Sequence, residues 1–177
     1  RKNIFDIAEQ LNYKKSKRQK KTSPQTHRIA IVEWYTELEE LDDLYYYSIR
    51  LGIEKKAQEL GYDIVRIFNN DSLSQLERID GIIAIGKFSS KQVKELEQYS
   101  PDLVFVDSDT LDQGHSCVTT DFMHAVTHVL DHFLEQGIQE IGMIAGREET
   151  ADGTISLDDP RLSCFCRYLI EKDLYRP

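Results

Sequence analysis

Three histidines in the stretch HAVTHVLDHFLEQG have the spacing that points most directly to chemistry. His124, His128 and His132 lie four residues apart, which places their side chains on one face of a helix. Histidines at this spacing can hold a zinc ion, and a zinc site would indicate an enzyme. The apolar residues of the same helix fall on the opposite side, and acidic residues lie among the histidines. We therefore favour an exposed polar face, which lacks the enclosed shell that a functional metal site needs, and expect no metal.

Other catalytic motifs are not found in the sequence. The stretches DGIIAIG and GMIAG end in glycine, but neither matches a dinucleotide-binding or P-loop pattern, so these glycines are expected to allow tight strand exits. No G-x-S-x-G turn and no Ser, His and Asp arrangement can be recognised. Cys164 and Cys166 would point apart on a helix, and an odd total of three cysteines fits a reducing cytoplasm. These patterns predict neither enzymatic activity nor a cofactor.

Charge is distributed unevenly along the 177 residues. Residues 1–28 carry nine Lys or Arg and two acidic residues, whereas the remainder carries 13 bases and 29 acids. A basic arm on an acidic body is typical of contact with a polyanion, and a merely solvated tail is the alternative. The segment RKNIFDIAEQLNYKK has no apolar core and no cleavage site, so it does not resemble a signal peptide. No apolar run is long enough to cross a membrane, and we expect a cytoplasmic protein.

The order of the predicted elements defines the fold class. After a helical segment at 3–11 and a linker at 14–28, buried strands alternate with amphipathic helices. The predicted strands cover residues 29–34, 63–68, 78–86, 102–108, 116–120 and 140–146, and the predicted helices cover 42–62, 89–100, 122–137 and 160–174. This alternation predicts an α/β fold with doubly wound parallel sheets, in which ligands bind beyond the carboxyl ends of the strands.

Two of these elements carry more specific expectations. The helix at 42–62 has five apolar residues on one face, which we expect to be buried. They are Tyr45, Ile49, Ile53, Ala57 and Leu60. The strand at 140–146 is separated by an acidic loop from a single following helix, which cannot cover a parallel strand on both faces. We therefore expect a second lobe that is incomplete in this chain.

Several stretches carry a family resemblance. They are RKNIFDIAEQLNYKK, SIRLGIEKKAQELGYDIVRI, RIDGIIAIG, CVTTDFMHAVTHVLDHFLEQGIQEIGMIAG and PRLSCF. Together they resemble the lactose- and galactose-repressor (LacI/GalR) family of bacterial transcription regulators. The first stretch is similar to the last headpiece helix, and the second to the first helix and second strand of the effector-binding core. RIDGIIAIG is similar to the Asp-Gly-Ile-Ile strand of that core. The fourth stretch is similar to the crossover into the second lobe, and PRLSCF to an Arg-Leu-x-Gly-Phe helix start. Residues 33–69 most resemble galactose-responsive members from lactic-acid and streptococcal bacteria.

Some positions depart from the family pattern. The chain has Cys164 and Ile138 where the family usually has Gly and His, and Lys15 and Ser16 replace the typical Pro and Asn. No apolar hinge helix can be recognised between residues 14 and 27, and two of the three headpiece helices have no counterpart in these residues. How DNA would be read therefore does not follow from the residues present.

The resemblance implies a division into three parts. Residues 1–27 correspond to the end of a DNA-binding headpiece and its basic linker. Residues 28–118 correspond to the first lobe of an effector-binding core of the periplasmic-binding-protein-like type, and residues 119–177 to the start of the second lobe. The effector of such proteins lies in the cleft between the lobes, where the fold alone would also place a ligand.

Four effector-binding residues are expected from the matching positions. Trp34 and Tyr35 leave the first strand at the cleft edge, where aromatic rings either stack on a sugar or cap the core. Asp107 matches a position that accepts sugar hydroxyls, and its alternative role is to cap a strand end. Arg161 matches the effector arginine of the family, whose planar fork can donate to two oxygens at once.

The resemblance implies a sugar-responsive transcriptional repressor. Galactose would bind the cleft and favour a lobe arrangement with lower affinity for operator DNA. A homodimer is expected, since the aromatic run Tyr45–Tyr47 offers more apolar surface than one helix face buries internally. The rival is a sugar-binding protein of a transport system, for which a secretion signal should stand in place of the basic arm. Fold alone does not decide between these classes.

Overall fold

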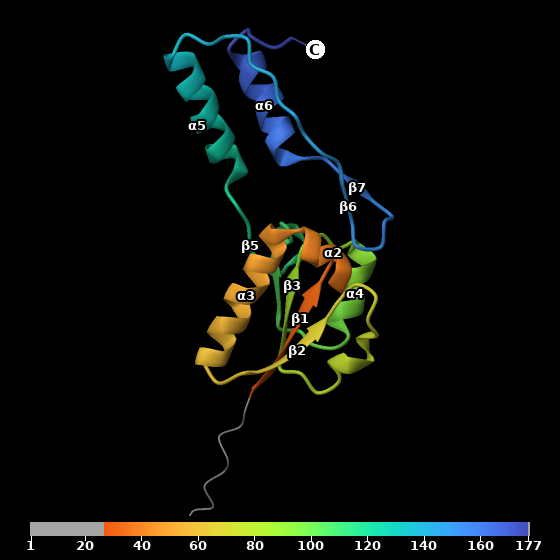
Figure 1. The fold of residues 1–177 in the computed structure, drawn as a ribbon. Helices are drawn as coiled ribbons and strands as arrows, with labels where there is room; N and C mark the ends of the chain where they lie inside the picture. The colour runs from red at the N-terminus through yellow and green to blue at the C-terminus, as the bar shows by residue number, and fades with distance from the viewer. Residues whose placement is uncertain (1–26, 177) are drawn as a thin grey trace, which may run out of the picture.

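The computed structural model describes residues 27–176, which fold into two lobes that lie one above the other in Figure 1. The first lobe is built on a five-stranded sheet with strand order β2-β1-β3-β4-β5. Its strands are β1 (Arg28–Glu33), β2 (Asp63–Ile67), β3 (Gly81–Ile85), β4 (Leu103–Val106) and β5 (Ser116–Val118). Each pairing within this sheet is parallel, so the carboxyl ends of all five strands face the second lobe. The predicted parallel sheet and its fifth strand are confirmed. The helical segment predicted at 3–11 and nearly all of the basic linker predicted at 14–28 lie outside the described residues.

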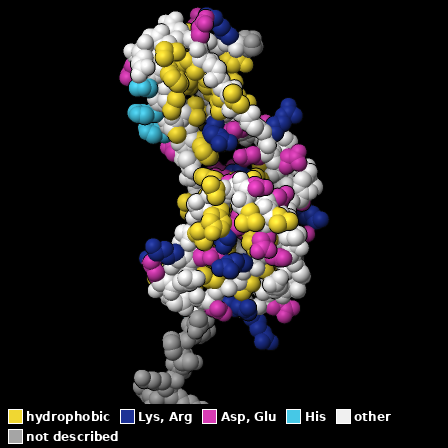
Figure 2. Space-filling model, in the orientation of Figure 1, with side chains coloured by type: hydrophobic (Ala, Val, Ile, Leu, Met, Phe, Trp, Pro, Cys, Tyr) yellow, Lys and Arg dark blue, Asp and Glu magenta, His cyan; other side chains and the backbone are white. Residues whose placement is uncertain are grey.

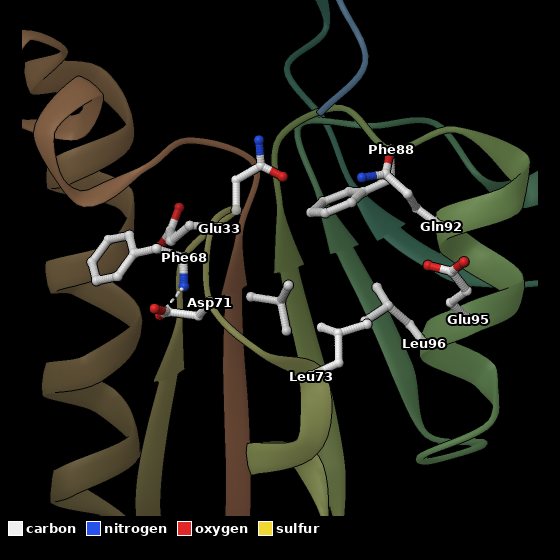
Figure 3. Close-up of a pocket in the computed structure, with 10 residues that line it drawn as sticks. Glu33, Phe68, Asp71, Leu73, Phe88, Gln92, Glu95 and Leu96 are labelled. Carbon is white, nitrogen blue, oxygen red and sulfur yellow. Dashed lines mark hydrogen bonds between the residues drawn. The ribbon is translucent and has the colours of Figure 1, made fainter. Parts of the chain in front are cut away.

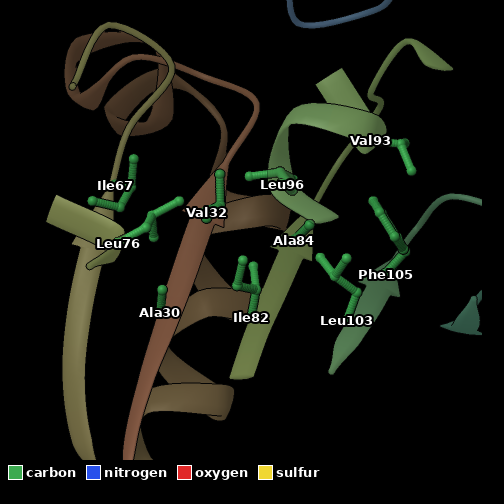
Figure 4. Packing of buried hydrophobic residues seen from close by; sticks show 10 residues of the cluster. All are labelled: Ala30, Val32, Ile67, Leu76, Ile82, Ala84, Val93, Leu96, Leu103 and Phe105. Atoms are coloured by element: carbon green, nitrogen blue, oxygen red, sulfur yellow. The ribbon is translucent and has the colours of Figure 1, made fainter. Parts of the chain in front are cut away.

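Helices cover both faces of the sheet, as a doubly wound fold requires. The elements on these faces are α3 (Leu44–Glu59), η1 (Leu73–Leu76) and α4 (Ser90–Glu97). A further short helix, η2 (Leu111–Gln113), precedes β5 and buries none of its residues. Successive side chains of β1 point to opposite faces. Ala30 and Val32 pack toward α4 and η1, as Figure 4 shows, whereas Ile31 packs toward α3. Both faces of the sheet are therefore shielded from water at β1, which explains why this strand is a continuous apolar run.

Helix α3 buries a face that overlaps the predicted one but is shifted from it. Ile49, Ile53 and Ala57 pack inward as expected. Tyr45 and Leu60 are 49% and 61% exposed, so the prediction was wrong for both. The helix instead buries Tyr46, Arg50 and Glu54, each less than a tenth exposed. Periodicity misassigned this face because it counted charged residues as solvated, whereas here they have buried partners.

Those partners form a cluster of charges in which Glu33, Glu40, Arg50 and Glu54 are buried. Arg66, whose side chain is 52% exposed, pairs with Glu54 at the edge of this cluster. A short helix absent from the sequence prediction, α2 (Glu37–Asp42), brings Glu40 over the end of β1. Arg50 Nη2 donates to Glu40 Oε2 at 2.7 Å, and Arg50 Nη1 donates to Glu54 Oε1 at 2.7 Å. Such hydrogen-bonded pairing offsets the cost of removing these charges from water. The carboxylate of Glu33 has no hydrogen-bond partner within residues 27–176, and its nearest cation, Arg50 Nε, lies 3.9 Å away.

The second lobe consists of two helices and a hairpin. They are α5 (Phe122–Glu135), the strands β6 (Glu148–Glu149) and β7 (Ser156–Leu157), and α6 (Pro160–Glu171). The two helices pack together through Leu130, Tyr168 and Leu169. Asp159 caps α6 as predicted, because its side chain accepts a hydrogen bond from the Arg161 backbone N–H. None of the helices within residues 27–176 is long and apolar enough to cross a membrane.

The predicted strand at 140–146 is not a strand. Residues 138–147 have no regular secondary structure, and Ile144 is fully exposed. A parallel strand needs a neighbouring strand for its backbone hydrogen bonds and cover for both faces. Within the described part of the second lobe, the only other strands are β6 and β7, which pair with each other. The region predicted as an acidic loop thus contains the only paired strands of this lobe as described.

Glu33 should make the stability of the first lobe depend on pH. Burial, followed by the negative charge of Glu40, raises the pKa of Glu33 to about 8. Because the carboxyl has a higher pKa folded than unfolded, its contribution to stability is complete below pH 4.5 and is lost as the pH rises through about 8. We expect Glu33→Gln to reduce the pH dependence of the free energy of unfolding and to stabilise the protein at pH 9 by roughly 1–4 kcal/mol.

Urea unfolding at a series of pH values measures this effect. Glu59→Gln is the matched control, since Glu59 is an exposed glutamate on α3. Equal pH dependence in the wild type and Glu33→Gln would contradict the assignment.

Candidate functional site

A cleft of about 330 Å³ lies between the two lobes, at the carboxyl ends of the strands. Its walls come from the end of β1, the start of α3, the loops after β3 and β4, the crossover into the second lobe, β6 and the start of α6. The lining residues are Tyr35, Asp43, Tyr45, Tyr46, Lys87, Asp107, Thr120, Phe122, Glu148, Pro160 and Arg161. This volume and position are those of a small-molecule site in a doubly wound fold.

Asp107 is the most tightly held polar residue of the cleft. It follows β4 directly, is 6% exposed and has a left-handed backbone with φ of 64°. One carboxylate oxygen, Oδ2, accepts from the Tyr46 hydroxyl at 2.5 Å and lies 3.0 Å from Lys87 Nζ. The other oxygen, Oδ1, has a long contact of 3.5 Å to the Tyr45 hydroxyl. Tyr46 and Lys87 therefore orient the carboxylate and leave Oδ1 able to accept a stronger hydrogen bond from a ligand.

Arg161 reaches the same cleft from the second lobe. Its backbone is fixed by the Asp159 cap, and its Nε donates to Asp159 Oδ1 at 2.8 Å. This hydrogen bond raises the pKa of Arg161 above its ordinary value. Nη2 lies 3.5 Å from Glu148, and the guanidinium lies over the Phe122 ring at 5.2 Å. The side chain is 41% exposed, so its remaining donors are accessible to a ligand.

The two aromatic residues after β1 have different surroundings. Tyr35 lines the cleft, with its ring 5.4 Å from that of Tyr46. Trp34 is 6% exposed and packs behind Tyr35 in the core of the first lobe. Its ring lies against Gly86, where an added Cβ would be 2.2 Å from the indole. Three of the four predicted site residues thus line one cleft, and Trp34 is not among its lining residues.

Sequence reasoning missed six polar residues of the cleft: Asp43, Tyr45, Tyr46, Lys87, Thr120 and Glu148. Lys87 had a usable signal, because it directly follows the strand stretch DGIIAIG just as Asp107 follows DLVFV. Tyr46 had none, since periodicity placed Tyr45 inward instead. Glu148 reaches the site through β6, which the sequence did not predict.

A second hollow, of about 150 Å³, lies on the first lobe beside α4. Figure 3 shows Phe68, Leu73, Phe88 and Leu96 around it. None of the four predicted residues lines it. The inter-lobe cleft is the candidate site because Tyr35, Asp107 and Arg161 all line it.

The fold and the cleft define a two-lobed α/β protein of the periplasmic-binding-protein-like type. No family model matches the chain. It is 46% identical, over 98% of its length, to the HTH-type transcriptional regulator GalR of Streptococcus thermophilus. It is 32% identical, over its whole length, to the HTH-type transcriptional regulator GalR of Lacticaseibacillus casei. The chain covers 53% of each of these relatives, or about half their length. The chain belongs to the LacI/GalR family of bacterial transcription regulators.

Solved structures support the same fold. A lac repressor dimer bound to operator and the anti-inducer ONPF matches with a TM-score of 0.63 at 19% identity, covering 98% of this chain and 53% of that one. A complex of the transcriptional regulator CelR with cellobiose matches with a TM-score of 0.63 at 16% identity, covering 99% of this chain and 54% of that one.

The histidines of α5 lie on the surface, as Figure 2 shows at the edge of the upper lobe. The rings of His124 and His128 stack with centroids 6.0 Å apart, and the His132 ring contacts Gln136. Within residues 27–176, no group of three or more His, Cys, Asp or Glu residues is placed to hold a metal ion.

We expect zinc to bind these histidines weakly or not at all, because an exposed face supplies no enclosing shell. Calorimetric titration of the wild type and His128→Ala tests this. A stoichiometric site with submicromolar affinity that His128→Ala removes would contradict it.

Proposed function

We propose that this chain is part of a sugar-responsive, DNA-binding transcriptional repressor, and that its effector binds in the cleft between the lobes. The observation that carries the proposal is the pairing of Asp107, from the first lobe, with Arg161, from the second, around one cavity. A ligand held from both sides stabilises one arrangement of the lobes over others. Such coupling can shift operator affinity only by the ligand's differential affinity for the two arrangements.

The charges of the cleft favour a neutral sugar over a sugar phosphate. Three carboxylates and two cations line it. Both cations already have an acidic partner: Lys87 pairs with Asp107, and Arg161 pairs with Asp159. A phosphate group would have to displace a carboxylate, whereas hydroxyls can donate to one. Galactose is the proposed effector, in keeping with the GalR names of the relatives, with Tyr35 stacking on its apolar face.

The DNA-binding role is proposed from the basic residues 1–28 and the relatives, which are named as HTH-type regulators. The proposed location is the cytoplasm, where operator DNA lies, and neither an enzymatic activity nor a cofactor is part of the proposal. The alternative, a sugar-binding protein of a transport system, would bind sugar in the same cleft. It would not release DNA in response.

The complete protein is proposed to act as a dimer. Apolar side chains are exposed on α2 and at the start of α3: Leu38 at 77%, Leu41 at 64% and Leu44 at 73%. These three leucines lie close together in sequence on one corner of the first lobe. A patch of this kind fits a two-fold interface between identical surfaces.

The effector proposal is tested with Arg161→Ala in the full-length protein. Removing the guanidinium leaves sugar oxygens without a charged donor, at a cost of about 1.5–3 kcal/mol, which is roughly a ten- to hundredfold loss of sugar affinity. Arg161→Lys should recover little, because an ammonium cannot reproduce the planar fork. Operator binding without sugar should be unchanged.

Sugar-dependent release of labelled operator at fixed salt is the measurement, and Arg167→Ala, on the exposed side of α6, is the control. Equal sugar sensitivity in wild type and Arg161→Ala would remove Arg161 from the site. A wild type that binds sugar but releases no operator would favour the transport alternative.

For the dimer, we expect Leu41→Glu to shift the full-length protein toward monomer in sedimentation at micromolar concentration, because a charge would be buried at the interface. Leu111→Glu is the control, since Leu111 is a similarly exposed leucine on η2, at 66%. A monomeric wild type would refute the dimer.

A further inference from the structure

The turn between β6 and β7 crosses from the second lobe to the first. Ala151 donates its backbone N–H to the Lys87 carbonyl at 2.8 Å, and its own carbonyl accepts from Asn69 Nδ2 at 2.8 Å. Ser89 Oγ donates to Asp152 Oδ2 at 2.7 Å. Ala151 also packs against the apolar cluster of the first lobe that includes Trp34. The contact between the lobes is thus both polar and apolar.

The turn is rigid enough to act as one piece. Asp152 Oδ1 accepts from the hydroxyls of Thr150 and Thr154 at 2.7 Å each, and the Thr154 backbone N–H lies 3.2 Å away. Thr150 is 5% exposed. Its backbone N–H donates to the Ile155 carbonyl at 2.9 Å, and its hydroxyl accepts from the Ile155 backbone N–H at 3.2 Å. Gly153 closes the turn with a φ of 64°, a conformation that glycine adopts without strain.

The first-lobe side of this contact is joined to the cleft through Lys87. The Lys87 carbonyl accepts from the turn, while its ammonium pairs with Asp107 in the cleft. Two residues further on, Ser89 both caps α4 and binds Asp152. Within residues 27–176, the chain crosses between the lobes at residues 119–121 and then returns to the first lobe only through this turn.

We infer that residues 150–154 form a latch that holds the lobes in the arrangement in which Asp107 and Arg161 line one cleft. The consequence of the latch is control of effector affinity, and this consequence rests on the proposed function. Opening the latch breaks the hydrogen bond to the Lys87 carbonyl and separates the two lobes at the side of the cleft. Because the latched arrangement is the one that can grip a ligand from both sides, its population sets the apparent affinity.

Ser89 offers a matched pair of substitutions that separates the latch from helix capping. Ser89→Asp keeps a good N-cap for α4 and places a second carboxylate against Asp152, whose pKa is held well below its usual range by the Ser89, Thr154 and Thr150 hydroxyls. The two negative charges should open the latch. Ser89→Asn has nearly the same size, also caps a helix, and can donate its amide N–H to Asp152. Asn69→Ala is an independent variant, which removes only the bond to the Ala151 carbonyl.

Two measurements on the full-length protein decide the proposal. Hydrogen exchange of the Ala151 amide reports the latch without any ligand, and calorimetric titration with galactose reports the cleft. In Ser89→Asp, we expect exchange about tenfold faster than in Ser89→Asn and galactose affinity about five- to tenfold lower. Asn69→Ala should give smaller changes in the same directions.

The outcomes separate the latch from the proposed function. Equal Ala151 exchange in Ser89→Asp and Ser89→Asn overturns the latch. Faster exchange with unchanged galactose affinity overturns its control of the cleft. If the wild type binds no monosaccharide, the effector proposal fails, and the exchange comparison alone then decides whether the latch exists.

Discussion

The parallel direction of the strands is the constraint on which the site depends. Because every pairing in the first sheet is parallel, β1, β3 and β4 all end at the edge that faces the second lobe. Tyr35, Lys87 and Asp107 follow these three strand ends and are brought together although they are far apart in sequence. The second lobe then adds Arg161 from the first turn of α6. The cleft is therefore a consequence of topology, and its chemistry comes from the few residues placed after each strand.

The buried charge of Arg50 determines how α3 is oriented at this edge of the sheet. Arg50 lies under α2 and is held by Glu40 and Glu54, so its guanidinium is compensated although it is almost excluded from water. Tyr46 lies one turn earlier on the same face of α3, and its hydroxyl reaches Asp107. The rotation of α3 that buries Arg50 thus also aims Tyr46 into the cleft. A rotation that buried Tyr45 instead would lose both interactions, which explains why apolar periodicity alone placed the wrong residues inside.

The loop after β3 contacts the second lobe through Lys87 and Ser89. Gly86 allows the Trp34 ring to lie directly on the backbone, in space that any side chain would occupy. This close packing places Lys87 where its ammonium meets Asp107 and its carbonyl meets the turn of the second lobe. Three kinds of interaction converge within a few residues: aromatic packing, an ion pair and a backbone hydrogen bond. Affinity in the cleft and the arrangement of the lobes are therefore expected to be coupled through this loop.

The sequence by itself determined the parallel α/β class, the five strands of the first lobe, the cap at Asp159, the exposed histidine face, and the placement of Asp107 and Arg161 near strand and helix ends. These follow from local patterns, namely continuous apolar runs, capping residues and helical spacing. Only the tertiary structure decided that Tyr35 lines the cleft while Trp34 lies in the core, that α3 buries Arg50, that residues 140–146 form no strand, and that β6 and β7 reach back to the first lobe. Each of these depends on partners distant in sequence, because a buried charge, an aromatic ring and a strand are stabilised only by what lies beside them in space.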